Sequence, residues 1–285
     1  MFAYPRDLRS LALGALTAIP LLFLAGAGQA QQNVDVELVL AVDVSLSMSP
    51  GEMEIQRRGY ASALTDDSVI GAIEAGRHGR IAIAYFEWAG DFSQRLVVPW
   101  TVIASAEDAA HVADMLEINP PRSARRTSIS GAMNFAADLF AESSYSGERR
   151  IVDISGDGPN NQGAPVEEAQ GRLIEAGITI NGLPLMTDAG ATSTYDVENL
   201  DQYYTECVIG GVGAFMIPVN DWSQFPEAVR RKLVMEIAGY TPSPRELPVI
   251  NVQAQASTDC LIGEKMWQDR IWRWRDDPTV GPSIP

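Results

Sequence analysis

The stretch VELVLAVDVSLSM, residues 36–48, decides how this chain is interpreted. Residues 36–42 are almost all apolar and mostly β-branched or aliphatic, which is typical of a strand buried on both faces of a parallel sheet. Asp43 ends this run, and Ser45 and Ser47 follow at alternate positions in a more polar segment. Ligands collect at the carboxyl ends of strands in such sheets, so an acid and two hydroxyls at this point indicate a binding site.

Other apolar runs alternate with helical patterns from residue 34 to about residue 239. The predicted strands are 36–43, 80–88, 94–100, 149–155, 177–185 and 213–219. The predicted helices are 52–75, 105–117, 129–142, 164–176, 196–205 and 222–238. The run at 94–100 follows its predecessor closely enough to pair with it as an antiparallel edge strand. We therefore expect an α/β fold, a doubly wound Rossmann-like sheet that is mostly parallel and has helices on both faces.

The chain divides into three predicted parts. Residues 1–30 have an Arg-containing start, the apolar run LALGALTAIPLLFLAGA and a small-residue end, so they are interpreted as an export signal cut after Ala30 or after Ala27. An uncleaved membrane anchor is the alternative. Residues 31–240 form the main domain. Export predicts a periplasmic or secreted protein, and no later apolar run is long enough to span a bilayer.

Residues 241–285 are a C-terminal extension that begins with a proline-rich segment and is too small to form its own core. Its residues Trp267, Ile271 and Trp274 have helical spacing, so we expect a helix that packs on the main domain. A helix lying in a membrane interface is the alternative, although its polar face mixes acidic and basic residues. Cys207 and Cys260 are predicted to form a disulfide in an oxidising compartment, with two separate buried thiols as the alternative.

The net charge of −16 argues against nucleic acid as a partner, because an acidic surface repels phosphates. Two further polar segments, RRTSISGAM at 125–133 and DISGDGPNNQG at 153–163, should reach the same edge of the sheet as Asp43. The combined oxygen donors are Asp43, Ser45, Ser47, Thr127 and Asp157. Such donors suit Mg²⁺ or Mn²⁺ rather than Zn²⁺. Taken singly, the hydroxyls are equally explained as helix caps and Asp157-Gly158 as a turn.

Asp43-Val44-Ser45-Leu46-Ser47 resembles the DxSxS element of the von Willebrand factor A (VWA) domain, whose metal-ion-dependent adhesion site (MIDAS) adds a threonine and an aspartate from later loops. Thr127 and Asp157 match these two positions. The resemblance covers roughly residues 34–240, and SGDGPNNQG resembles an exported bacterial branch of the family. Gly156 is an insertion relative to the usual T/S-D-G turn, which leaves Asp153 as the alternative acid; Asp157 is favoured because Asp153 lies inside the predicted strand.

The resemblance implies that Ser45, Ser47 and Thr127 bind Mg²⁺ (or Mn²⁺) directly, while Asp43 and Asp157 act through coordinated waters. Neutral hydroxyls leave the ion electron-poor, so a carboxylate from a partner protein can fill the remaining position. The expected function is that of an exported, non-catalytic binding module. The expected partner-binding rim consists of Arg125, Arg126, Asn160 and Asn161, with Gln162 beside them. A solvated basic pair and an Asn-rich turn are the simpler explanations, and Glu87 and Asp91 are interpreted as solvated loop residues.

Two other functions compete with this hypothesis. A Mg²⁺-dependent phosphohydrolase would use Asp43 as its nucleophile, but phosphatases of the haloacid-dehalogenase type need a second acid two residues later, and that position is Ser45. The sequence also lacks GxSxG, HExxH and Walker motifs. The other alternative is a VWA scaffold whose metal site is unoccupied.

Overall fold

The computed structural model describes Met1 and residues 31–187, 197, 199–239 and 258–276. The predicted export signal, apart from Met1, and the proline-rich segment at 240–250 lie outside the described residues. The side chain of Trp274, the last member of the predicted C-terminal stripe, lies outside them as well. Among the described residues, no helix has the length and apolar content needed to cross a bilayer.

A five-stranded sheet with the order β3-β2-β1-β4-β5 forms the centre of the fold. β1 (Gln32–Asp43) lies in the middle and runs parallel to both β2 (Ile81–Trp88) and β4 (Tyr145–Gly156). β5 (Thr179–Pro184) is parallel to β4, whereas β3 (Gln94–Ile103) is antiparallel to β2 at the other edge. The α/β fold and the antiparallel edge strand are therefore confirmed.

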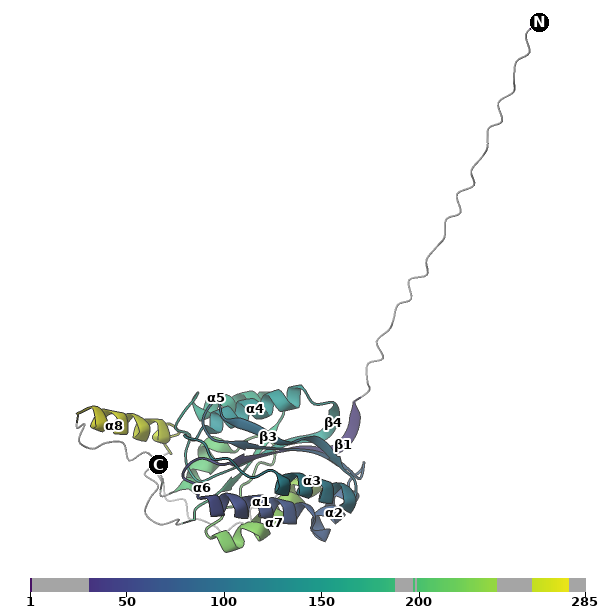
Figure 1. The fold of residues 1–285 in the computed structure, drawn as a ribbon, viewed down its shortest axis with the longest axis horizontal. Helices are drawn as coiled ribbons and strands as arrows, with labels where there is room; N and C mark the ends of the chain where they lie inside the picture. The colour runs from purple at the N-terminus through teal and green to yellow at the C-terminus, as the bar shows by residue number, and fades with distance from the viewer. Residues whose placement is uncertain (2–30, 188–196, 198, 240–257, 277–285) are drawn as a thin grey trace. The chain divides into compact units, whose positions relative to one another are not determined.

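Helices cover both faces of this sheet (Figure 1). One face carries α1 (Pro50–Leu64), α2 (Asp67–Glu74), α3 (Ala106–Ile118) and α7 (Phe225–Ala238). The other face carries α4 (Ile129–Ala141), α5 (Val166–Glu175), α6 (Leu200–Tyr203) and a π-helical turn (Tyr204–Val208). β1 supplies Leu38 and Leu40 to the first core and Val39 and Ala41 to the second, because successive strand residues point to opposite faces. This explains why the strand is almost wholly apolar.

Three predicted elements differ in the structure. The helix expected at 52–75 is two helices, because the Asp66 side chain accepts a hydrogen bond from Ser68 N (2.9 Å) and so caps a new helix. The helix expected at 196–205 begins at Leu200 and passes into the π-helical turn, with 196 and 198 outside the described residues. The strand expected at 213–219 is an irregular segment beside β5, joined to it by isolated bridges such as Gly182 to Met216.

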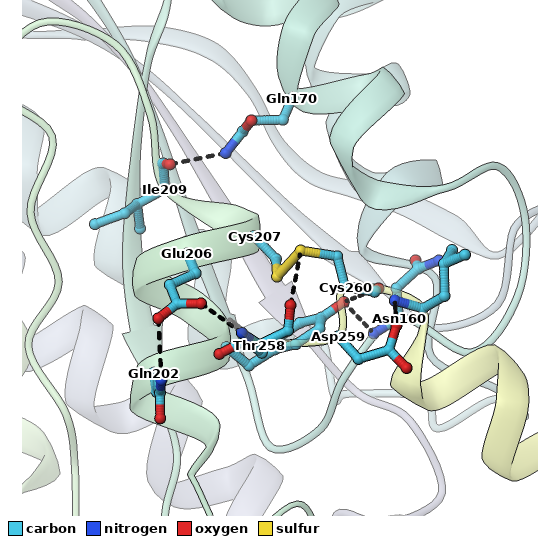
Figure 2. Close-up of a disulfide and its surroundings, with 11 residues drawn as sticks. Asn160, Gln170, Gln202, Glu206, Cys207, Ile209, Thr258, Asp259 and Cys260 are labelled. Atoms are coloured by element: carbon cyan, nitrogen blue, oxygen red, sulfur yellow. Dashed lines mark hydrogen bonds between the residues drawn. A yellow bond between two sulfur atoms is a disulfide. The ribbon is translucent and has the colours of Figure 1, made fainter. Parts of the chain in front are cut away.

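Cys207 and Cys260 form the predicted disulfide. It joins the π-helical turn to the segment that leads into α8 (Ile262–Asp276), as Figure 2 shows. The bond closes a loop between positions 53 residues apart, for which the loss of chain entropy in the unfolded state is about 4 kcal/mol. The alternative of two separate thiols is thereby excluded.

A buried charge cluster connects α7 to β4. Lys232 Nζ lies 2.7 Å from Asp153 Oδ1 and also donates to Glu236, and each of the three residues is 1% exposed. Burial raises the pKa of Asp153 from its ordinary value of 3.8 to about 7, against the opposing effect of the Lys232 charge. The Asp153 side chain is therefore buried against Lys232 of α7 and is not part of the surface at the strand ends.

This cluster predicts a pH dependence of stability. Between about pH 4 and pH 7 the folded protein keeps the Asp153 proton that the unfolded chain has already released, so this group's contribution to the free energy of unfolding falls as pH rises. The slope is at most about 1.4 kcal/mol per pH unit. Urea denaturation at several pH values should show that Asp153→Asn removes this slope. An unchanged slope in the variant would mean that Asp153 does not titrate in this range.

Candidate metal site

The ends of β1 and β4 place Asp43 next to the loop that carries Asp157. Val42 of β1 is in register with Ser155 of β4, so the residues that follow each strand emerge side by side. After Asp43 the chain turns because Ser45 N donates a hydrogen bond to Asp43 Oδ1 (2.7 Å). Gln56 of α1 holds this strand end by donating to the Asp43 carbonyl oxygen (3.0 Å).

A chain of hydroxyl groups connects the two loops. Ser45 Oγ lies 2.8 Å from Ser47 Oγ, and Ser47 Oγ donates to Asp157 Oδ1 at 2.8 Å. Ser45 is buried, whereas Ser47 is exposed and Asp157 is partly exposed. Four of the five predicted ligands, Asp43, Ser45, Ser47 and Asp157, therefore form one group that opens to solvent on the side of Ser47.

The backbone of Thr127 is hydrogen-bonded to the loop after β4. Its N–H donates to Asn161 Oδ1 (3.0 Å), and its carbonyl oxygen accepts from Asn161 N (2.8 Å). Just before it, Ala124 forms an isolated bridge with Ser45, and Arg126 has a positive φ of 78°. The segment that carries Thr127 thus lies between the loop after β1 and the loop after β4.

A buried ion-pair network anchors the start of that segment. Glu87 lies in β2, is 2% exposed and forms ion pairs with Arg57 and Arg95. Arg57 also donates to the carbonyl of Asn119, and Arg95 to that of Pro120 (2.8 Å). The interpretation of Glu87 as a solvated loop residue was wrong, because two arginines from neighbouring elements cover it.

Among the described residues, no salt bridge to a basic side chain compensates the Asp43 carboxyl group. Its side chain is fully buried, and its Oδ2 has no hydrogen-bond partner within the part of the chain that the structure describes. Burial, with a further contribution from the negative charge of Asp157, raises the pKa of Asp43 well above its usual range. A cation between the two carboxyl groups would stabilise their charged forms.

Only a site that includes hydroxyl ligands fits this arrangement. Over the described residues, no group of three or more His, Cys, Asp and Glu side chains is placed to hold a metal ion. Ser45 and Ser47 supply neutral oxygens, Thr127 is the third predicted hydroxyl ligand, and Asp43 and Asp157 carry the negative charge. Hard divalent cations such as Mg²⁺ and Mn²⁺ prefer such oxygens, so this donor set fits the ion that the sequence predicts.

Gly156, which departs from the usual T/S-D-G turn, makes a close contact in this site. A Cβ at this position would lie 2.9 Å from Tyr204 Oη, 3.1 Å from Asp43 Oδ2 and 3.2 Å from a ring carbon of Trp88. Burial and the charges of Asp43 and Asp157 raise the pKa of Tyr204. Sequence reasoning missed Tyr204 and Trp88, because an aromatic residue in an apolar pattern normally indicates a core position.

The predicted rim residues have different roles in the structure. Arg125 is exposed as expected, but the guanidinium of Arg126 lies 3.1 Å from the centre of the Trp267 ring. Asn160 and Asn161 are 0% and 6% exposed, which corrects the expectation that they face a partner. Their side chains support the loops instead, as when Asn160 Oδ1 accepts from Ser130 N (3.0 Å).

Two neighbours of the rim also support loops. Gln162 Oε1 accepts a hydrogen bond from Asp91 N (3.2 Å), and Ser128 Oγ donates weakly to Asp91 Oδ1 (3.5 Å). Asp91 is partly buried in this arrangement. Gln162 and Asp91 therefore connect the loop after β4, the loop after β2 and the start of α4.

A family model described as "Protein of unknown function (DUF1194)" matches residues 33–241. The chain belongs to the DUF1194 family. No curated protein sequence matches this DUF1194 protein. The match to the family model ends at residue 241, so α8 lies beyond the part of the chain that the model covers.

Three solved structures illustrate what the DUF1194 protein is similar to. Proximal thread matrix protein 1 from the mussel byssus, with a zinc-occupied MIDAS motif, is 16% identical (TM-score 0.53; 73% of this chain and 49% of that chain covered). A von Willebrand factor type A protein from Catenulispora acidiphila is 14% identical (TM-score 0.50; 72% of this chain and 43% of that chain covered). The pilus adhesin SpaC from Lactobacillus rhamnosus GG is 11% identical (TM-score 0.54; 74% of this chain and 32% of that chain covered). At these identities the similarity establishes a VWA-like fold, over less than half of each matched chain.

The Gly156 contact can be tested with a matched pair of glycine variants. Gly156→Ala should displace the Asp43 carboxyl group or the Tyr204 ring, because its Cβ has no room. We expect the affinity for Mn²⁺, measured by calorimetric titration, to fall by about tenfold, as when groups that orient metal ligands are lost. Gly158→Ala is the control, since a Cβ there meets nothing within 4 Å. Equal affinities for both variants would contradict a role for Asp43 in the site.

Proposed function

We propose that this DUF1194 protein is an exported, non-catalytic binding module that engages a protein partner through a bound divalent cation. The observation that carries the proposal is the hydroxyl chain from Ser45 through Ser47 to Asp157, which lies beside the buried Asp43 carboxyl group. In the proposed site Ser45, Ser47 and Thr127 bind the cation directly, and the two acids act through coordinated waters. The mussel matrix protein with its zinc-occupied MIDAS motif supports this reading by structural similarity.

Mg²⁺ or Mn²⁺ is the proposed ion, because neutral oxygens surround it and histidine and cysteine do not. Two acids acting through waters compensate the charge of the ion only at a distance, so its open coordination position favours an anionic ligand. A carboxylate of the partner suits that position. The protein has a net charge of −16, so the cation would also reduce the local repulsion that an acidic partner meets. The similarity to a pilus adhesin supports a protein partner.

A phosphohydrolase mechanism receives no support from the geometry. Asp43 is 0% exposed, and its Oδ2 is packed close to Gly156, so the carboxyl group is not presented to a substrate. The position two residues later, where an acid would be required, is Ser45, whose Oγ is already within hydrogen-bond distance of Ser47. Asp43 is therefore not accessible as the nucleophile that this mechanism requires.

Export to the periplasm or the medium is part of the proposal. The signal-like pattern in residues 1–30 supports it, and so does the Cys207–Cys260 disulfide, since disulfides persist mainly in oxidising compartments.

The decisive experiment measures cation binding and partner capture in the same set of variants. Purified protein should bind Mg²⁺ and Mn²⁺ in calorimetry, and Ser45→Ala or Thr127→Ala should weaken binding by about tenfold or more. Ser62→Ala, a change at an exposed helical serine outside the site, is the control. In affinity capture from envelope extracts, we expect a protein that is retained with Mg²⁺ and lost with EDTA or Ser45→Ala. Absence of cation binding, or retention that EDTA and Ser45→Ala leave unchanged, would refute the proposal.

A further inference from the structure

α8 is attached to the main domain at the turn that supplies Tyr204 to the candidate site. The disulfide connects Cys260, just before α8, to Cys207 in the π-helical turn Tyr204–Val208 (Figure 2). Tyr203 Oη accepts from Asn160 N (3.2 Å) and lies 3.5 Å from the Cys260 carbonyl oxygen. Ile262 packs against the core on this face of the sheet. The beginning of α8 is therefore fixed beside the loop after β4.

The first turn of α8 contacts the loop that carries Asp157. Gly263 packs so closely on this loop that a Cβ there would overlap the Asn160 carbonyl oxygen. Glu264 Oε1 accepts a hydrogen bond from Asn160 Nδ2 at 2.6 Å. Asn160 is fully buried and also binds Ser130 at the start of α4. Glu264 thus stabilises the side chain that fixes this loop.

The next turn of α8 contacts the segment that carries Thr127. The Trp267 ring lies 3.1 Å from Cζ of Arg126, which is the residue directly before Thr127. A cation–π contact of this kind is worth most when water is partly excluded. Arg126 has a positive φ, an unfavourable conformation for a non-glycine residue that surrounding contacts must maintain. Trp267 supplies one of these contacts.

We propose that α8 is a positioning element of the cation site, and that its docking, secured by the Cys207–Cys260 disulfide, raises the affinity of the site for its cation. This inference rests on the proposed function. Glu264 and Trp267 are positioning residues that act through Asn160 and Arg126. Asn161 joins the two loops through its two hydrogen bonds with Thr127, so support from α8 on each side keeps their ligands at a fixed separation.

The physical reason lies in the weakness of neutral oxygen ligands. A hydroxyl group binds a divalent cation less strongly than a carboxylate does, so such a site depends on ligands that are held in place before the ion arrives. Ser45 is held by a hydrogen bond to Asp43 within its own segment, whereas Thr127 and Asp157 lie on the two loops that α8 contacts. The loops are therefore where added support has the largest effect on affinity.

The test measures the binding of Mn²⁺ without any partner protein, from the electron paramagnetic resonance signal of the free ion. The Ser45→Ala variant gives the correction for nonspecific binding. Trp267→Ala, Glu264→Ala and the double variant Cys207→Ser/Cys260→Ser should each weaken Mn²⁺ binding by about tenfold. Glu264→Gln retains an oxygen acceptor for Asn160 Nδ2 and should restore most of the affinity. Gln268→Ala, at an exposed position on α8, is the matched control and should bind like the wild type.

A second measurement separates this inference from the proposed function. Hydrogen exchange of the amides at 124–128 and 157–163, without metal, should be faster in Trp267→Ala and Glu264→Ala than in Gln268→Ala. If the wild type binds no Mn²⁺, the proposed function and the effect on affinity both fail, and exchange alone shows whether α8 positions the loops. Unchanged affinity with unchanged exchange would overturn the inference. Tighter Mn²⁺ binding in the variants would also overturn it, because α8 would then be a lid.

Discussion

The carboxyl group of Asp43 is buried at the end of the central strand and lies close enough to Asp157 for their charges to interact. Ionising a buried carboxyl group beside a second acid is costly unless a positive charge accompanies it. Within the described residues, no salt bridge to a basic side chain includes Asp43, and its Oδ2 lacks a hydrogen-bond donor. We propose that the surrounding hydroxyls and the close contact at Gly156 hold a cation that supplies this charge.

Other buried charges in the same domain are compensated by the protein itself. Lys232 neutralises much of the charge of Asp153 and Glu236 beneath the sheet, and Arg57 and Arg95 surround Glu87 near the strand ends. Breaking either cluster would leave an uncompensated buried charge, so both are structural requirements. The contrast with Asp43 separates charges that hold the fold together from charges that, as we propose, surround a bound cation.

The strand ends and the extension make separate contributions to the site. The VWA-like sheet brings the loops after β1 and β4 together, and this arrangement lies within residues 33–241 matched by the DUF1194 family. α8 lies beyond that match, yet it contacts Arg126 and Asn160 on the two loops that carry Thr127 and Asp157. The disulfide ties the segment just before α8 to the π-helical turn. In the proposed site, this small extension supports the loops that carry two of the ligands.

By itself, the sequence determined the sheet and the local character of its ends: apolar runs predict buried strands, and Asp43, Ser45 and Ser47 lie together because they are neighbours in the chain. Tertiary structure decided which distant side chains join them. The strand predicted at 213–219 is irregular, Glu87 and Asn160 are buried rather than solvated, and Tyr204 lies against Gly156. Periodicity reports the face on which a residue lies, but its burial and partners depend on segments that fold over it from elsewhere in the chain.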